Sequence, residues 1–289
     1  MRRLTAAVCV AVVAALAGCD RSGSPNPLFD AAGYHVRGDS VFFLQAFPGR
    51  AIQVGGADAA TFQSLDRTFA KDGTAVYVDG RELPDADPTS FELLDRPDFA
   101  KDDARVYQRD TVFSDDPANF ELLDGNLAKD SAAVYWSDGR VLSDDPAHFT
   151  IVSDSEYYLF TKDDRFVHVN GNLVAGADPA TFRVLADGYS RDDRDVFYFA
   201  ERIADADVES FDVLEGPFAR DARRGYWMGK PVPGADGATF GVLNAAFECS
   251  ADATRAFYRD EVIVDADPRA FPPGYAVTGC SNGSVFFAP

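Results

Sequence analysis

Hydrophobic and polar positions recur along most of the chain with a period of about 29 residues. A phenylalanine that follows an aspartate by four residues occurs eight times, at steps of 29, 29, 29, 33, 29, 29 and 31 residues. The phenylalanines are Phe62, Phe91, Phe120, Phe149, Phe182, Phe211, Phe240 and Phe271, and the aspartates are Asp58, Asp87, Asp116, Asp145, Asp178, Asp207, Asp236 and Asp267. Self-similarity at a nearly constant spacing is typical of a tandem repeat protein.

A basic residue followed by aspartate marks a second position between these anchors. The pairs are Lys71-Asp72, Lys101-Asp102, Lys129-Asp130, Lys162-Asp163, Arg191-Asp192 and Arg220-Asp221. Aspartate favours turns because its carboxylate caps nearby backbone N–H groups. A valine and an aromatic residue usually follow, which predicts a short strand. Asp79-Gly80, Asp138-Gly139 and Asn170-Gly171 then predict two-residue hairpin turns.

The Asp-Pro-x-x-Phe segment predicts a one-turn helix. Aspartate is a favoured N-cap residue, and proline is tolerated at the first helical position. An alanine before the aspartate in six units predicts a hydrophobic staple onto the phenylalanine. Asp115 and Asp144 stand there in the third and fourth units, which should lack the staple. We expect the phenylalanines to be buried between neighbouring units.

These elements together predict an all-β fold. We expect eight hairpin-plus-short-helix units of about 29 residues to form an elongated or curved array over residues 34–289, ending in a half-unit. The 33-residue step contains an insertion, residues 153–160, that fits a surface loop or a bulged strand. A closed propeller-like ring is the alternative, although 29 residues are few for a blade, which usually takes ~40–45.

The periodic Lys-Asp turns, Val-Tyr strands and Asp-Pro-x-x-Phe segments resemble the DKNYY family of bacterial repeat proteins. The resemblance extends from about Tyr34 to Pro289. The aromatic pair is usually Val-Tyr here rather than Tyr-Tyr, and the last units drift from the pattern. The resemblance implies an exported or envelope-associated β-rich domain, but no activity, substrate or cofactor.

The N-terminus predicts export. Residues 1–18 combine a basic start with an apolar run too short to span a bilayer, as in a signal peptide. The sequence Leu16-Ala17-Gly18-Cys19 resembles a lipobox, so Cys19 is the predicted lipidated residue (diacylated, as with palmitate). Asp20 marks retention at the inner membrane, facing the periplasm, in enteric Gram-negative bacteria. Residues 19–33 then form the lipidated cysteine and a flexible tether.

Charge and cysteine content restrict the partners. The chain has a formal net charge of -20, and removing residues 1–18 takes away two bases and no acid, which leaves -22. Such a surface repels nucleic acid and anionic lipid headgroups, so Cys19 is the predicted sole membrane anchor. Cys249 and Cys280 remain in the exported part and predict a disulfide; two buried free thiols are the alternative.

The sequence contains no catalytic constellation, and we predict no cofactor and no metal site. His35, His148 and His168 are scattered without zinc-ligand spacing, and the latter two fit structural positions. Gly38-Asp39-Ser40 superficially resembles a hydrolase motif without its partner blocks. Five aspartate pairs leave calcium as an open alternative: Asp102-Asp103, Asp115-Asp116, Asp144-Asp145, Asp163-Asp164 and Asp192-Asp193.

Two function classes follow. The first is a non-enzymatic envelope lipoprotein whose repeat domain binds a protein or glycan partner. The second is an envelope hydrolase with a site in non-repeated segments, residues 153–160 or 47–56.

Overall fold

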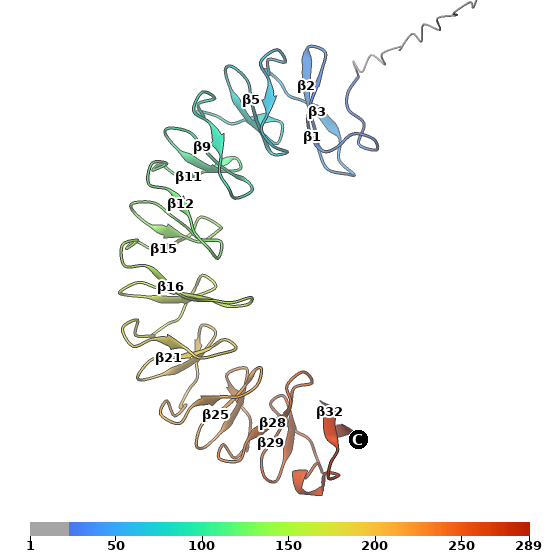
Figure 1. Ribbon diagram of the computed structural model, residues 1–289, viewed down its shortest axis with the longest axis vertical. Coiled ribbons are helices and arrows are strands. Elements are labelled where there is room, and N and C mark those ends of the chain that lie inside the picture. The colour runs from blue at the N-terminus through green and yellow to red at the C-terminus, as the bar shows by residue number, and fades with distance from the viewer. Residues whose placement is uncertain (1–22) are drawn as a thin grey trace, which may run out of the picture. The chain divides into compact units, whose positions relative to one another are not determined.

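The computed structural model describes residues 23–289, which are almost entirely β-structure in small antiparallel sheets. The predicted signal peptide and Cys19 therefore lie outside the described residues. The chain divides into two compact units, Met1–Ala118 and Asn119–Pro289, called here the N-terminal and the C-terminal unit. In each unit the sheets follow one another in chain order (Figure 1).

The N-terminal unit contains one three-stranded sheet and two four-stranded sheets. The first consists of β1 (Gly33–Arg37), β2 (Ser40–Leu44) and β3 (Ala51–Gln53). The second consists of β4 (Gln63–Ser64), β5 (Phe69–Lys71), β6 (Val76–Val78) and β7 (Arg81–Glu82). The third consists of β8 (Glu92–Leu93), β9 (Phe99–Lys101), β10 (Val106–Gln108) and β11 (Thr111–Ser114).

The C-terminal unit contains five four-stranded sheets and a final two-stranded sheet. Its first two sheets are β12 (Glu121–Leu122), β13 (Ala128–Lys129), β14 (Val134–Tyr135) and β15 (Val141–Ser143), then β16 (Thr150–Asp154), β17 (Leu159–Lys162), β18 (Val167–Val169) and β19 (Asn172–Leu173). The next two are β20 (Arg183–Val184), β21 (Tyr189–Arg191), β22 (Val196–Tyr198) and β23 (Glu201–Arg202), then β24 (Asp212–Val213), β25 (Phe218–Arg220), β26 (Gly225–Trp227) and β27 (Lys230–Pro231). The last are β28 (Gly241–Asn244), β29 (Cys249–Ala251), β30 (Ala256–Tyr258) and β31 (Glu261–Val262), then β32 (Ala276–Ser281) and β33 (Ser284–Ala288).

The predicted all-β repeat array is confirmed, with a four-stranded meander as its unit. Every sheet within residues 23–289 is built from strands that are consecutive in sequence. The two-stranded sheet at the end is the predicted half-unit. The insertion at residues 153–160 lengthens the β16–β17 hairpin, with a bulge between Ile151 and Ser153.

The predicted short helices are wrong in all but one unit. The Asp-Pro-x-x-Phe segments are single turns, and only Pro268–Ala270 forms a short 3₁₀ helix. The N-cap contact itself is present, for example from the backbone N–H of Thr89 to the Asp87 carboxylate at 3.0 Å. In the other seven units the next strand begins directly after the phenylalanine, so no residues remain to extend the turn into a helix. We call these segments connectors.

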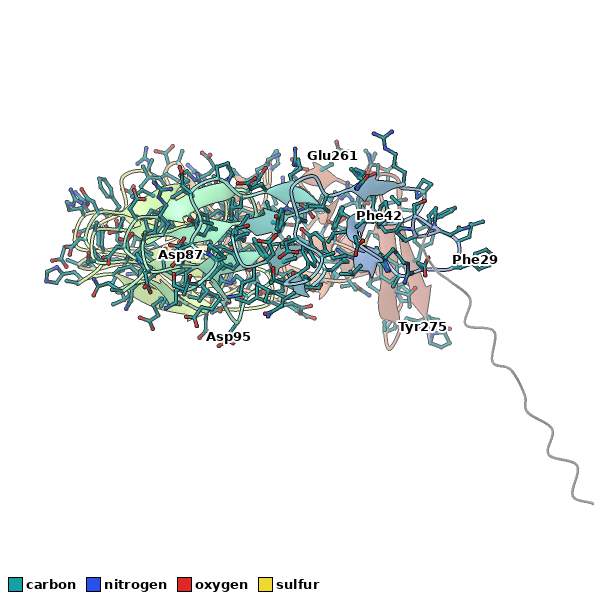
Figure 2. The ribbon with its side chains drawn as sticks, turned by 90° about the horizontal axis from the view of Figure 1, so that it is seen from above. Phe29, Phe42, Asp87, Asp95, Glu261 and Tyr275 are labelled. Carbon is teal, nitrogen blue, oxygen red and sulfur yellow. A yellow bond between two sulfur atoms is a disulfide. The ribbon has the colours of Figure 1, made fainter. Side chains whose placement is uncertain are left out.

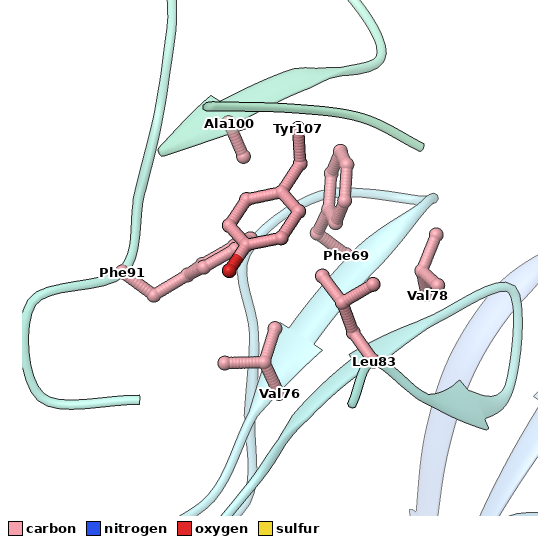
Figure 3. Close-up of a cluster of buried hydrophobic side chains, with 7 residues drawn as sticks. All are labelled: Phe69, Val76, Val78, Leu83, Phe91, Ala100 and Tyr107. Atoms are coloured by element: carbon pink, nitrogen blue, oxygen red, sulfur yellow. The ribbon is translucent and has the colours of Figure 1, made fainter. Parts of the chain in front are cut away.

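Connector phenylalanines pack between the sheet before them and the sheet after them, as the ring contacts of Phe62, Phe91, Phe211 and Phe240 show. Phe91, Phe182 and Phe240 are buried as predicted, and the other five are half-buried. Phe91 lies with its ring centroid 5.6 Å from Phe69 and 5.9 Å from Tyr107 of the next sheet. Figure 3 shows Phe91 beside Tyr107, with Val76 and Leu83 completing the cluster. Burying such a side chain contributes about 1.5–3 kcal/mol, so the connectors stabilise the stacking of successive sheets.

The staple alanines also pack as predicted. Ala86 packs against the Phe69 cluster, and the alanines of the other five units pack against their own clusters. Asp115 and Asp144, which replace alanine in two units, are exposed. Figure 2 shows charged side chains over the outside of the sheets, with Asp95 pointing into solvent. Within residues 23–289, no helix has the length and hydropathy needed to cross a bilayer.

Candidate functional sites

A buried aspartate in the turn between the second and third strands organises each four-stranded sheet. Its Oδ1 atom accepts the backbone N–H groups two and three residues later, at 2.7–2.9 Å wherever the turn occurs. The seven turn aspartates are Asp72, Asp102, Asp130, Asp163, Asp192, Asp221 and Asp252. The sequence reading missed Asp252, because alanine precedes it instead of lysine or arginine.

The second carboxylate oxygen joins the turn to the connector and to the core. Asp72 Oδ2 accepts the backbone N–H of Asp58 at 2.9 Å and the hydroxyl of Tyr77 at 2.7 Å. Asp102 and Asp221 make the same pair of contacts. Burial would raise the pKa of Asp72, but these hydrogen bonds outweigh it and lower the pKa to about 2. The strand aromatic predicted from the sequence therefore also closes the turn.

One repeat has a histidine at the connector position where most repeats have a serine or threonine. In five units a serine or threonine three residues after the connector aspartate accepts the N–H that follows the turn aspartate, as Thr61 does from Gly73. His148 occupies this position, with Nδ1 2.8 Å from Asp145 Oδ2 and 3.8 Å from Asp164 Oδ2. Hydrogen bonding to Asp145 and the nearby Asp164 charge raise the pKa of His148.

The predicted aspartate pairs are largely accounted for by the turns. The first member of the pairs at Asp102, Asp163 and Asp192 is buried and accepts several N–H or O–H donors, which a cation would have to displace. Asp145, His148 and Asp164 form the one group of acidic and imidazole ligands within residues 23–289 whose spacing suits a metal ion. This group is mostly exposed, and its histidine is already bonded to Asp145.

The other two histidines lie in the fold as separate groups. His35 contacts the carbonyl of Ala31 at 2.7 Å, and His168 lies on β18 at the strand-aromatic position. Burial lowers the pKa of His168. Asp39 lies in the exposed β1–β2 turn. Cys249 and Cys280 form the predicted disulfide, with Cα atoms 5.7 Å apart, and join β29 to β32.

The hairpin turn between the third and fourth strands has a constant backbone and a variable side chain. Its first residue has a positive φ of 46–59° in six sheets. These residues are Asp79, Arg109, Asn170, Phe199, Met228 and Arg259. Asp79-Gly80 and Asn170-Gly171 form the predicted two-residue turns with both φ values positive. The prediction for Asp138-Gly139 is wrong, because Tyr135 pairs with Val141 across a longer loop.

A hollow of about 580 Å³ lies beside these hairpin turns in the N-terminal unit. The β6–β7 turn contributes Asp79 and Gly80, β7 contributes Arg81, and the β10–β11 turn contributes Arg109. Arg109 pairs with Asp79 and, at 3.2 Å, with Asp98. The remaining wall comes from the first sheet and its β2–β3 loop, and from Arg67. The hollow therefore touches the non-repeated segment 47–56 through Ile52.

A smaller hollow of about 310 Å³ lies in the C-terminal unit between two further hairpin turns. Phe199 of the β22–β23 turn and Met228 of the β26–β27 turn line it, together with Tyr198 and Ile203. Met228 keeps 41% of its surface exposed. No sequence signal indicated either hollow, because their walls come from different sheets.

Comparison with known proteins supports the resemblance drawn from the sequence. The model of the DKNYY family matches residues 31–111, which include the first three sheets up to the start of β11. The same strand order and turn aspartates continue through residues 119–289. No curated protein and no solved structure matches the chain.

Proposed function

We propose that this chain is an envelope lipoprotein, tethered through Cys19, whose repeat domain binds a protein or glycan partner at the hairpin turns of its sheets without catalysing a reaction. The observation that supports this proposal most is that the buried turn residue is constant among the repeats, whereas the hairpin-turn residue varies. Aspartate recurs at the buried turn in all seven four-stranded sheets, whereas the first hairpin-turn residue changes from one sheet to the next.

The backbone conformation of the hairpin turns does not favour the side chains found there. A positive φ favours glycine, asparagine or aspartate, and costs other residues of order 1–3 kcal/mol. Phe199, Met228, Arg109 and Arg259 nevertheless have this conformation. Arg109, Met228 and Arg259 are exposed there, whereas Phe199 packs partly against Tyr158. Methionine and arginine are enriched at protein–protein interfaces. Both hollows described above lie against these turns, which supports the same location for the partner.

The proposed location rests on the N-terminal sequence and the disulfide. Disulfides persist in oxidising compartments outside the cytoplasm, and Cys249–Cys280 is consistent with such a compartment. The lipobox-like Leu16-Ala17-Gly18-Cys19 supports lipid attachment, and the net charge of -20 argues against adsorption by the protein surface.

Site-specific photo-crosslinking in cells tests the proposal. A photoreactive amino acid at Asp110 or Met228 probes the hairpin turns, and one at Thr89 or Ala180 probes exposed connector positions of the same units. We expect mass spectrometry to identify a partner enriched at the turn positions over the connector positions. Equal capture at both sets, or no enrichment over an unrelated lipoprotein carrying the same amino acid, would refute binding at the turns.

One observation favours the enzyme alternative. The hollow of about 580 Å³ borders residues 47–56, one of the two segments in which a catalytic site was predicted. Its carboxylate, Asp79, is held in an ion pair with Arg109 and offers no obvious nucleophile or base. Activity-based screening of the purified protein against ester, amide and glycoside substrates would support this alternative only if Asp79→Asn abolished the turnover.

A further inference from the structure

The hollow in the N-terminal unit is lined by more basic than acidic residues, whereas the chain as a whole is acidic. The whole sequence has 27 bases and 47 acids, but the residues that line the hollow include three arginines and one aspartate. We propose that this hollow is a binding site for a monoanionic carboxylate carried on an apolar body. This inference deepens the proposed partner-binding function by naming the chemistry recognised at one of its turn clusters.

The three arginines differ in how far they are already engaged. Arg109 is paired with both Asp79 and Asp98. Arg81 lies 3.8 Å from Asp110 across an exposed pair, a type of contact that is worth little in water. The guanidinium of Arg67 has no hydrogen-bond or ion-pair partner among residues 23–289. Arg67 is therefore the primary anion-binding group, with Arg81 beside it.

This arrangement favours a carboxylate over a dianionic phosphate. A guanidinium binds a carboxylate through two parallel N–H···O hydrogen bonds. One unpaired and one weakly paired guanidinium match a single negative charge. The Asp79 carboxylate in the same wall would repel a second negative charge.

The lining from the first sheet suits an apolar group. Phe43, Ala46 and Ile52 line the hollow from the first sheet and its β2–β3 loop. Phe43 is fixed from behind, because a Cβ atom at Gly80 would lie only 2.5 Å from the Phe43 Cβ. The volume of about 580 Å³ falls within the range of ~300–1,000 Å³ typical of ligand pockets, and accepts a group of amino-acid to short-peptide size.

Isothermal titration calorimetry of the purified full-length chain with N-acetyl-phenylalanine and its neutral amide tests the site. The two probes have nearly the same size and shape, and the amide replaces the carboxylate by an uncharged group. We expect the acid to bind with one-to-one stoichiometry and the amide to bind at least about tenfold more weakly, the factor expected for one lost charge-assisted hydrogen bond. Binding of the acid should weaken in high salt.

Matched variants assign the binding to Arg67. Arg67→Gln should lower the affinity for the acid about tenfold and leave the amide unchanged. Arg183→Gln removes the same charge from an exposed arginine in the C-terminal unit and should leave both affinities unchanged. Thermal unfolding of both variants checks that the fold is intact. Equal binding of acid and amide, an unaffected Arg67→Gln variant, or no saturable binding at millimolar concentration overturns the inference.

A third probe distinguishes two possible sources of the carboxylate, the C-terminus of a polypeptide and a small organic acid. N-acetyl-Ala-Ala-Phe with a free C-terminus should bind more tightly than N-acetyl-phenylalanine if a polypeptide end is the natural ligand, and equally if a small acid is. The outcome is also separable from the cellular experiment. Partner capture at the turns without binding of the acid refutes this inference alone, whereas binding of the acid without capture refutes the macromolecular partner alone.

Discussion

The turn aspartates make a quantitative prediction about stability. Asp72 accepts five hydrogen bonds, from the N–H groups of Asp58, Thr74 and Ala75 and from two hydroxyls. Asp72→Asn keeps one acceptor oxygen and turns the other into a donor that faces the N–H of Asp58. The substitution therefore removes the link between turn and connector while leaving the shape of the side chain nearly unchanged.

The loss can be expressed in two ways, both of which rest on these hydrogen bonds. Losing hydrogen bonds from Asp58 and Tyr77 to a charged acceptor costs about 1.5–3 kcal/mol each at most, and the Tyr77 hydroxyl can reorient to accept from the new amide. The lowering of the Asp72 pKa from 3.8 to about 2 corresponds to about 2–3 kcal/mol in favour of the charged, folded form. We expect Asp72→Asn to lower the free energy of unfolding by about 3 kcal/mol at pH 7.

The pH dependence separates this mechanism from a general packing defect. A carboxylate with a lowered pKa stabilises the fold above its unfolded-state pKa of about 3.8, and this stabilisation is lost as the pH falls through about 2. The variant has no titrating group at this position. The stability difference between wild type and Asp72→Asn should therefore shrink between pH 4 and pH 2, as measured by urea unfolding followed by circular dichroism.

Local and control measurements complete the test. Repeat arrays unfold with nearest-neighbour energetics, so hydrogen exchange at the N–H groups of Asp58 and Ala75 reports the effect within one unit. Asp39→Asn removes an exposed turn carboxylate from the same unit and should change stability by less than about 0.5 kcal/mol. A stability difference that stays constant from pH 7 to pH 2.5 would refute the charge-based account of the turn.

Four further outcomes are expected. Replacing both Cys249 and Cys280 by serine should destabilise the last sheets by about 3–4 kcal/mol, seen as a lower midpoint without reductant that no longer responds to reductant. Gly80→Ala should cost more than about 2 kcal/mol in urea unfolding, because φ is 79° and the new Cβ meets Phe43; a smaller loss would contradict the close approach. A calcium chelator should leave the melting midpoint unchanged, and a lower midpoint would restore the calcium alternative. Cys19→Ala should shift the protein out of the membrane fraction or leave it unprocessed; a processed, membrane-bound variant would refute the lipoprotein proposal.

The sequence predicts the anchors of the repeat better than its strands. Asp87 and Phe91 could be placed because a capping residue and a large apolar residue at fixed spacing have one structural meaning each. The strand Phe69–Lys71 could not be foreseen. Three residues with alanine and lysine have little strand preference of their own. They become a strand because Ala70 pairs with Ser64 on one side and Tyr77 on the other.

The candidate site was not predictable from the sequence for a different reason. Arg67 lies in the β4–β5 loop, Arg81 begins β7 and Arg109 lies in the β10–β11 turn. No local spacing distinguishes them from other surface arginines. What brings them together is the stacking of successive sheets, which places hairpin turns of neighbouring repeats side by side. The sequence pointed to residues 47–56 only as a possible catalytic segment, whereas Ile52 of this segment forms part of the apolar lining of the hollow.

Part of the negative charge of the chain has a structural origin, so this charge does not by itself indicate a cationic partner. Seven turn aspartates and eight connector aspartates account for 15 of the 47 acidic residues. These side chains cap backbone groups within each repeat, so the negative charge accumulates with repeat number rather than by selection for a cationic ligand. Against this background, an arginine-lined hollow is a local departure that the repeat itself does not require. The arginine-lined hollow lies at hairpin turns whose side chains vary among the repeats. We therefore expect the array to recognise its ligand there.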